Sequence, residues 1–267
     1  MMGSDCDLTV LMAINKIDEF THDAISSILS QTFMDFEFRI ICNGADGEFI
    51  ADWLSREYRD ERITTSIVLV PGLANALNFG LSIIKTKYVA RMDADDLSLP
   101  QRFAEQIKYL NSNPEVGVLG CNVLLINEHG EELADKFMHF SSHGQIVRWL
   151  PIFNSMCHPA LMFRTECLRN LGGYKYGFHS EDHELFIRIS RESEWRFANL
   201  KQVLFKYRRH GNQMTGGGSL RIFAEVSGYL LMHLFKSGNI LFLVGIMWVS
   251  PPVIWAKKII RSIIRMF

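Results

Sequence analysis

The chain has 267 residues, enough for one large α/β domain or two small ones. Hydrophobic residues make up 48% and charged residues 21%, a composition that excludes global disorder. The formal net charge of −1 argues against nucleic acid as a partner. Five scattered cysteines indicate reduced thiols in a cytoplasmic protein, since their spacing fits neither a zinc site nor a disulfide framework. The N-terminus lacks a basic segment before its short apolar run, so we expect no signal peptide.

Apolar runs alternate with amphipathic stretches through the first half of the chain. Strands are predicted at 8–14, 36–42, 63–70 and 88–92, and helices around 24–29, 48–58 and 73–84. Pro100 then opens a helix to about Leu110, because the fixed φ of proline is tolerated in a first turn. This order predicts an α/β fold with a doubly wound, mostly parallel sheet. Ligands of such sheets bind beyond the carboxyl ends of the strands, where Asn43 and Asp93 stand.

The second half of the chain is less regular. Strands are predicted at 116–126, 160–163 and 203–208, and helices at 145–150 and 180–191. Gly216-Gly217-Gly218 is the best candidate for a linker, because glycine leaves the backbone loose. We therefore divide the chain into a domain at 1–215 and a helical tail at 216–267.

The tail combines apolar and basic residues. The apolar run 240–256 is shorter than a membrane-spanning helix, and Pro251-Pro252 interrupts it. The last residues place isoleucines on one helical face beside lysines and arginines, a pattern typical of a helix in an anionic membrane interface. Trp248, Trp255 and Phe267 add interfacial aromatic side chains. The alternative is a helix packed on the domain with a solvated basic edge.

Three carboxylates follow the fourth predicted strand, in Asp93-Ala94-Asp95-Asp96. Carboxylates this close repel one another unless a cation or hydrogen bonds compensate, and Mg²⁺ or Mn²⁺ prefers such oxygen ligands. The alternative is an acidic surface turn that caps the helix opened by Pro100. The apolar strand that leads into the cluster favours a functional site.

Two other stretches carry candidate functional groups. Glu181-Asp182 follows Ser180, where either acid could act as a general base or simply stabilise a helix N-terminus. Arg208 and His210 lie in Tyr207-Arg208-Arg209-His210, which could hold diphosphate oxygens or form an exposed basic turn. His158 stands alone before Pro159, and a lone histidine is usually structural.

Taken together, the motifs resemble the family 2 inverting glycosyltransferases of the GT-A fold across residues 7–212. In appearance the chain is most similar to bacterial enzymes that build O-antigen or capsule repeat units on a lipid carrier. The matching stretches keep the family's order and spacing: LTVLMAIN, AISSILSQT, IICNGADG, LANALNFGL, YVARMDADDLSLPQRFAEQIKYL, NPEVGVLG, CHPALMFR, LGGY, SEDHELFIRIS and YRRHGNQMT.

The resemblance implies roles for the residues that match. Asp182 would be the catalytic base, with Glu181 and His158 supporting the acceptor site. Asp95 and His210 would hold Mn²⁺ or Mg²⁺. The donor nucleotide sugar would contact the following residues: Ala13, Asn15, Asn43, Asn78, Asp93, Ala94, Asp96 and Arg208. The chain has Cys42-Asn43-Gly44-Ala45 where many members have Asp-Asp-Gly-Ser, which weakens the expectation of uridine, although the Asn43 amide oxygen can still accept a hydrogen bond.

The implied enzyme moves a hexose or N-acetylhexosamine from a nucleotide diphosphate sugar, by preference UDP-linked, to a lipid-diphosphate-linked saccharide. GlcNAc-diphosphoundecaprenol is an example of such an acceptor, and the expected location is the cytoplasmic face of the bacterial inner membrane. Two alternatives are a metal-dependent nucleotidyl or phosphoryl transferase, and a non-catalytic membrane-bound scaffold. The sequence has no P-loop, which argues against the first alternative. A non-catalytic scaffold would have no reason to keep all five acids, at positions 93, 95, 96, 181 and 182.

Overall fold

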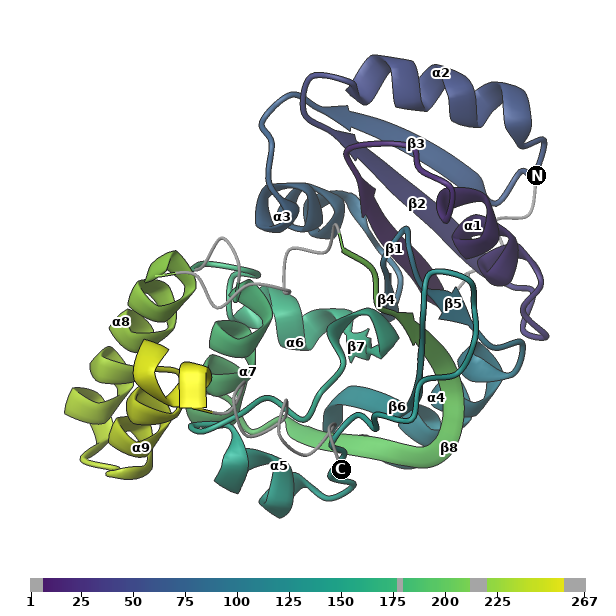
Figure 1. The fold of residues 1–267 in the computed structure, drawn as a ribbon. Helices are drawn as coiled ribbons and strands as arrows, with labels where there is room; N and C mark the ends of the chain where they lie inside the picture. Colours follow the sequence, from purple (N-terminus) through teal and green to yellow (C-terminus); the bar gives the residue numbers. More distant parts are fainter. Residues whose placement is uncertain (1–6, 177–179, 212–219, 257–267) are drawn as a thin grey trace.

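A computed structural model describes residues 7–176, 180–211 and 220–256 (Figure 1). The glycine run proposed as a linker and the basic segment 257–267 lie outside these described residues.

The first half of the chain alternates strands and helices as predicted (Figure 1). The elements are β1 (Leu8–Ile14), α1 (Thr21–Leu29), β2 (Phe36–Asn43), α2 (Gly47–Glu57), β3 (Ile63–Val68), α3 (Leu73–Ile83) and β4 (Tyr88–Met92). β1 pairs in parallel with β2 and β4, and β2 pairs in parallel with β3. The carboxyl ends of β1, β2 and β4 therefore meet at one edge of the sheet.

The second half completes a mixed sheet in the order β3-β2-β1-β4-β7-β6-β8-β5. Its elements are β5 (Leu97–Ser98), α4 (Arg102–Ser112), β6 (Val116–Ile126), α5 (His143–Trp149), η1 (His158–Ala160), β7 (Met162–Arg164), α6 (Thr165–Asn170), α7 (Glu181–Glu192) and β8 (Arg196–Arg208). β7 runs antiparallel to β4 and β6, whereas β8 runs parallel to β6. The fold is GT-A, with a parallel half and a mixed half.

Helices cover both faces of the sheet because side chains alternate along each strand. In β1, Val10 and Met12 pack in a core with α1, α2 and α4. Leu11 points to the other face, into a core shared with α3 and α7. Gly80 of α3 allows this second helix layer to approach β1, since a Cβ there would lie 2.4 Å from a methyl group of Leu11.

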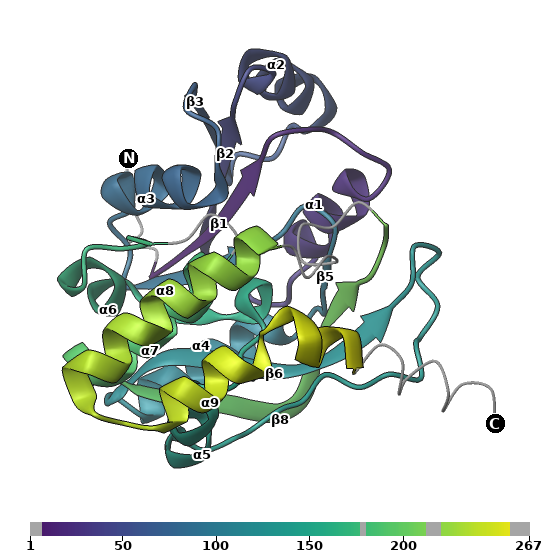
Figure 2. The same cartoon turned by 60° about the vertical axis from the view of Figure 1, so that its left-hand side comes forward.

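Two helices, α8 (Leu220–Ser237) and α9 (Leu241–Trp248), follow the domain and pack onto it (Figure 2). Val226, Leu230 and Phe242 are buried in the same core as α7. A Cβ at Gly245 would lie 1.8 Å from the Pro151 carbonyl oxygen, so α9 meets the domain in very close contact. The described part of the tail therefore packs on the domain, and residues 251–256 continue as helix.

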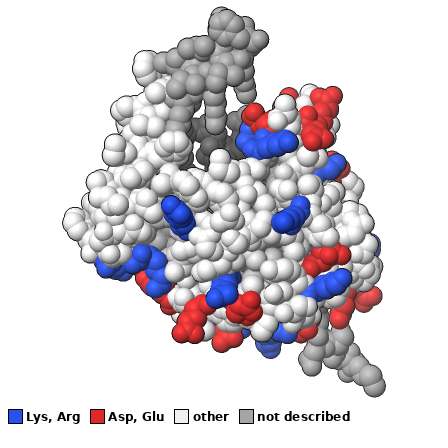
Figure 3. Space-filling model, turned by 90° about the horizontal axis from the view of Figure 1, so that it is seen from below, with Lys and Arg blue, Asp and Glu red and all other residues white. Residues whose placement is uncertain are grey.

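The outer sides of α8 and α9 are apolar. Phe235 is 80% exposed and Trp255 is 68% exposed, and Ile240, Leu243 and Met247 are also exposed. Few charged side chains appear on the left of Figure 3, the side on which these helices lie. No helix within the described residues is long and apolar enough to cross a membrane.

Candidate active site

A cavity of about 950 Å³ opens at the carboxyl ends of β1, β2 and β4. Its other walls are the loop before η1, the first turn of α7 and the end of β8. Ten residues predicted for the site line it: Ala13, Asn15, Asn43, Asp93, Ala94, Asp95, His158, Glu181, Asp182 and His210. Three others, Asn78, Asp96 and Arg208, are not among its lining residues.

A second cavity of about 690 Å³ runs beside β6, and Leu125 and Phe137 line both cavities. The smaller one is lined by Glu132 and Asp135, but by none of the acids predicted for the site. The larger cavity is therefore the candidate active site.

The acidic cluster has a geometry that suits a divalent cation. One carboxylate oxygen from each of Asp93, Asp95 and Asp96 lies within 4.8 Å of the others. Asp96 is fully buried, and its Oδ2 has no hydrogen-bond partner among the described residues, while its Oδ1 accepts the Arg208 backbone N–H at 2.8 Å. A buried carboxylate oxygen without a partner is costly, and a bound cation would remove that cost. The residues present thus fit Mn²⁺ or Mg²⁺.

His210 stands at the open side of this cluster. Its Nε2 lies 2.9 Å from Oδ2 of Asp95, and its ring packs on Phe20 with the centroids 4.9 Å apart. An imidazole nitrogen beside a carboxylate is a suitable additional metal ligand. The geometry is compatible with the predicted pairing of Asp95 and His210.

Arg91 is the cation closest to the acids in the described structure. Its guanidinium is buried and pairs with Asp93, and it also bonds the Met92 carbonyl. Burial raises the pKa of Asp93, whereas Arg91 lowers it. Burial also raises the pKa of Asp96 well above its usual range, with Asp95 adding to the effect. The site is thus electrostatically strained without further positive charge.

Glu181 and Asp182 occupy the first turn of α7, after Ser180 at its N-cap. Burial is the main cause that raises the pKa of Asp182 to about 6 and that of Glu181 to about 8. Backbone N–H groups of the first turn and Nδ2 of Asn154, 3.0 Å from Oδ2, favour the ionised form of Asp182. A carboxylate with a pKa near neutrality at a cavity wall has the properties of a general base.

The side chain of His158 is fixed by a hydrogen bond with Tyr174. Its Nε2 lies 2.8 Å from the Tyr174 hydroxyl, and burial lowers its pKa well below the usual range. It is therefore neutral, and its edge contributes to the cavity wall.

Asn78 was expected among the donor contacts, and in the structure its amide is engaged by the backbone of Tyr174. Its Nδ2 donates to the Tyr174 carbonyl at 2.7 Å, and its Oδ1 accepts the Tyr174 N–H at 2.9 Å. Gly172 and Gly173 precede this anchor with φ of +73° and +67°, a conformation that favours glycine. Asn78 thus fixes the LGGY loop, whose Tyr174 in turn holds His158.

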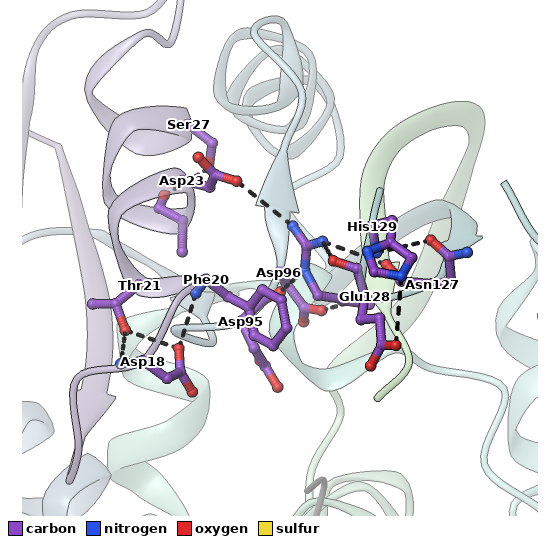
Figure 4. A network of polar contacts seen from close by, with 12 residues as sticks. Asp18, Phe20, Thr21, Asp23, Ser27, Asp95, Asp96, Asn127, Glu128 and His129 are labelled. Atoms are coloured by element: carbon purple, nitrogen blue, oxygen red, sulfur yellow. Dashed lines mark hydrogen bonds and ion pairs between the residues drawn. The ribbon is translucent and has the colours of Figure 1, made fainter. Parts of the chain in front are cut away.

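Arg208 also differs from the expectation that it contacts the donor. Its side chain is buried, and it donates to the Asp95 carbonyl at 2.9 Å and to the Glu128 carbonyl at 3.0 Å. Figure 4 shows Asp95 and Asp96 between α1 and the turn of Asn127 and Glu128. The Arg208 side chain therefore stabilises the acidic loop through the Asp95 carbonyl, and the Arg208 backbone N–H stabilises Asp96. Asp96 itself is too enclosed for the predicted donor contact.

The alternation of β8 explains the difference, because Tyr207 and Arg209 point to the side opposite Arg208 and line the cavity. Arg209 also bonds Asp135 at 3.2 Å. A basic residue does reach the cavity from this stretch, one position later than predicted.

Asn43 lies at the cavity and links the ends of β1 and β2 to the N-cap of α3. In the amide orientation that satisfies both groups, it donates to the Ile14 carbonyl at 3.0 Å and accepts the Gly72 N–H at 3.1 Å. Its amide oxygen keeps a second lone pair for a ligand.

Sequence reasoning missed Lys16, Arg91 and Asn154. Lys16 and Asn154 line the cavity from loops, where no periodic pattern indicates direction. Arg91 offered a signal, since an arginine inside an otherwise apolar strand must find buried acceptors.

A GT-A fold with an acidic cavity beyond its parallel strands is compatible with a glycosyltransferase. Residues 9–172 match the family model described as "Glycosyl transferase family 2", which is more than half of the chain. The chain belongs to this family.

Curated relatives agree with this assignment. The chain is 36% identical over 235 residues to the O-antigen biosynthesis glycosyltransferase WbnJ of Escherichia coli, covering 87% of this chain and 91% of WbnJ. It is 36% identical over 200 residues to the amylovoran biosynthesis glycosyltransferase AmsE of Erwinia amylovora, covering 70% and 73%.

Solved structures share the fold at low sequence identity. S. aureus TarS 1–349 in complex with UDP-GlcNAc matches with a TM-score of 0.66 and 13% identity, over 85% of this chain and 66% of that one. The mannosyltransferase PcManGT from Pyrobaculum calidifontis, in complex with GDP-Man and Mn²⁺, matches with a TM-score of 0.63 and 17% identity, over 96% and 75%. The chain thus spans about two thirds of the TarS structure.

Proposed function

We propose that this glycosyltransferase moves a hexose or N-acetylhexosamine from a UDP-sugar to a hydroxyl of a lipid-diphosphate-linked saccharide, with inversion, in O-antigen synthesis. The observation that carries the proposal is that one cavity holds the Asp93–Asp95 loop on one wall and Asp182 on another. The first group suits a nucleoside diphosphate with its cation, and the second suits a hydroxyl to be deprotonated.

The donor end of the cavity is formed by Ala13, Asn15 and Asn43 at the nucleoside, with Asp93 and Asp95 at the diphosphate. The cluster of Asp93, Asp95 and Asp96, together with His210, would hold Mn²⁺ or Mg²⁺, which supplies positive charge to the departing diphosphate when bound. Arg209 replaces Arg208 as the side chain able to reach phosphate oxygens. The UDP-GlcNAc bound by TarS and the GDP-Man and Mn²⁺ bound by PcManGT support a nucleotide-sugar donor and a metal.

The chemical step follows from the position of Asp182. Its carboxylate takes the proton of the acceptor hydroxyl while the oxygen forms a bond to the anomeric carbon. The bond from that carbon to the diphosphate oxygen breaks, and the electron pair leaves with the nucleotide. Attack from the face opposite the leaving group inverts the anomeric centre, so an α-linked donor gives a β-glycoside. A protonated Glu181 beside Asp182 can donate a hydrogen bond to the acceptor.

The acceptor and location rest on two supports. WbnJ carries O-antigen biosynthesis in its name, which suggests a lipid-linked saccharide such as GlcNAc-diphosphoundecaprenol. The exposed apolar sides of α8 and α9, with the basic segment that follows them in sequence, suit the cytoplasmic face of the inner membrane.

The competing functions lack a comparable support. A nucleotidyl or phosphoryl transferase is disfavoured because the sequence has no P-loop, and a scaffold would not need the buried, destabilising acids.

A release assay for nucleoside diphosphate tests the proposal. Purified protein is incubated with GlcNAc-diphospholipid and a panel of UDP- and GDP-sugars, and the product is sequenced by mass spectrometry and its anomer assigned by NMR. We expect release with a UDP-hexose or UDP-N-acetylhexosamine only when the acceptor is present, with a β-linked product from an α-linked donor. A retained anomeric configuration, or no transfer from any sugar of the panel, would overturn it.

A further inference from the structure

α8 contacts the start of α7, the helix whose first turn carries Glu181 and Asp182. Oε1 of Glu225 accepts two hydrogen bonds from Ser180, from the backbone N–H at 3.1 Å and from the hydroxyl at 2.8 Å. Ser180 is the N-cap residue of α7 and precedes Glu181 and Asp182. A carboxylate at a helix N-terminus is also favoured by the helix dipole. Glu225 thus supplies from another helix what a capping side chain normally supplies locally.

A second connection holds the residue on the other side of the acids. Nε2 of His183 lies 2.6 Å from the Leu150 carbonyl, and Nδ1 lies 2.8 Å from the Tyr229 hydroxyl. A carbonyl only accepts, so Nε2 carries the proton. Burial lowers the pKa of His183, so the ring is neutral and Nδ1 accepts from the Tyr229 O–H. The Leu150 carbonyl therefore sets the tautomer of His183, and the Tyr229 hydroxyl helps to fix the orientation of its ring.

The two connections enclose Glu181 and Asp182 between fixed neighbours. The backbone that carries both carboxylates is held by α8 at Ser180 and at His183. Apolar packing of Val226 and Leu230 fixes α8 to the same core as α7. A shift of α8 would therefore move Glu181 and Asp182 relative to the Asp93–Asp95 loop, because that loop follows β4 and is not part of α7.

We propose that Glu225 and Tyr229 are positioning residues for catalysis, and that α8 is a working part of the active site. This rests on the proposed role of Asp182 as the base. The helix lies outside residues 9–172, which the family model matches. The tail therefore acts on the rate of transfer as well as on where the protein resides.

The chain offers a matched control. At the far end of the same helix pair, Lys236 of α8 lies 3.9 Å from Glu192 of α7, with both side chains exposed. Glu192→Gln removes a carboxylate between α7 and α8 just as Glu225→Gln does, but far from the acids. The comparison distinguishes an effect on the position of Glu181 and Asp182 from a general weakening of the packing between α7 and α8.

The test measures steady-state kinetics of the full-length protein for Glu225→Gln, Tyr229→Phe and Glu192→Gln, together with UDP affinity by calorimetry. We expect kcat to fall about tenfold in the first two variants, the factor that ~1.4 kcal/mol of barrier produces, with unchanged UDP affinity and donor KM. Glu192→Gln keeps the wild-type kcat.

Hydrogen exchange of the α7 amides supplies a readout that does not depend on activity. We expect faster exchange in the first turn of α7 in Glu225→Gln and Tyr229→Phe, and not in Glu192→Gln. Wild-type kcat in both variants, or an equal loss in all three, would overturn the positioning role. Loss of first-turn protection together with full activity of Asp182→Asn would instead show that α8 holds α7 but that Asp182 is not the base.

Discussion

Nδ2 of Asn154 donates a hydrogen bond of 3.0 Å to Oδ2 of Asp182. The amide cannot turn away, because its Oδ1 accepts the Met156 N–H at 2.9 Å. Burial raises the pKa of Asp182 to about 6, and this hydrogen bond acts in the opposite direction by favouring the carboxylate. A loop residue therefore favours the ionised form of the proposed base, which lines the cavity.

Asn154→Ala tests this relationship. A hydrogen bond to a charged group contributes roughly 1.5–3 kcal/mol, so we expect kcat to fall about 10- to 100-fold if the bond counts fully in the transition state. The acid limb of the kcat profile should move to higher pH, because the ionised form of Asp182 loses a partner. Stopped-assay kinetics across pH measure both effects, with UDP affinity as the control. An unmoved acid limb at wild-type kcat would show that Asn154 does not serve the base.

Asp182→Asn removes the base while keeping the shape of the side chain. A positioned general base typically contributes ~10²–10⁴-fold, so turnover should fall by a factor in that range. The donor should still bind, because its proposed contacts lie on β1, β2 and the Asp93–Asp95 loop. Turnover and donor affinity are measured on the same preparation. A wild-type rate would remove Asp182 from the role.

The pH dependence follows from the raised pKa of Asp182. The base works only when ionised, so kcat should be half-maximal near pH 6 and fall about tenfold per unit below it. Arg91 favours ionisation from β4, while Glu181 on α7 opposes it when charged. The profile is measured with donor and acceptor saturating, so that it reports the bound complex. Activity that stays constant down to pH 4.5 would contradict a base with this pKa.

The sequence predicted the parallel half of the fold in detail because β1, β2 and β4 are largely buried apolar runs and the helices between the strands are amphipathic. β6 also matches its prediction at both ends. β5 and α6 were missed, since they are too short to show a period. β8 begins seven residues before the predicted Val203, since register shifts opposite Cys121 and Asn122 disturb its alternation.

The site residues divide in the same way into those that the sequence predicts and those that it does not. Asp93, Asp95 and Asp182 lie at ends of regular elements, where topology alone brings them to one cavity. Arg208, the last residue of β8, and Arg209, which follows it, are adjacent in sequence, but only Arg209 lines the cavity, a difference that the motif does not specify. Glu225 lies 45 residues beyond Ser180, and no local pattern links the two. Contacts between distant segments are decided by packing, which one sequence does not display.

Chelation tests the metal assignment. The three carboxylates of the DADD loop lie together, and a bound cation is the simplest compensation for the buried Asp96 oxygen without a partner. We expect excess EDTA to abolish transfer and Mn²⁺ or Mg²⁺ to restore it. Titration calorimetry should show Mn²⁺ binding in the presence of UDP, weakened at least tenfold in Asp95→Asn because one ligand loses its charge. Full activity in EDTA would rule out an essential metal.

The tail should hold the protein on anionic membranes through both of its parts. Met247 and Trp255 expose apolar surface, while Phe242 is buried and packs on His233. Deleting residues from Leu241 onward should release the protein to the soluble fraction, but it also uncovers the core around Phe242. Met247→Glu with Trp255→Glu avoids this, because both side chains point away from the domain, and it should weaken sedimentation with vesicles rich in phosphatidylglycerol. Removing only residues 257–267 should reduce binding to anionic vesicles more than to neutral ones, since it removes positive charge. If all three forms sediment like the intact protein, the tail is not the anchor.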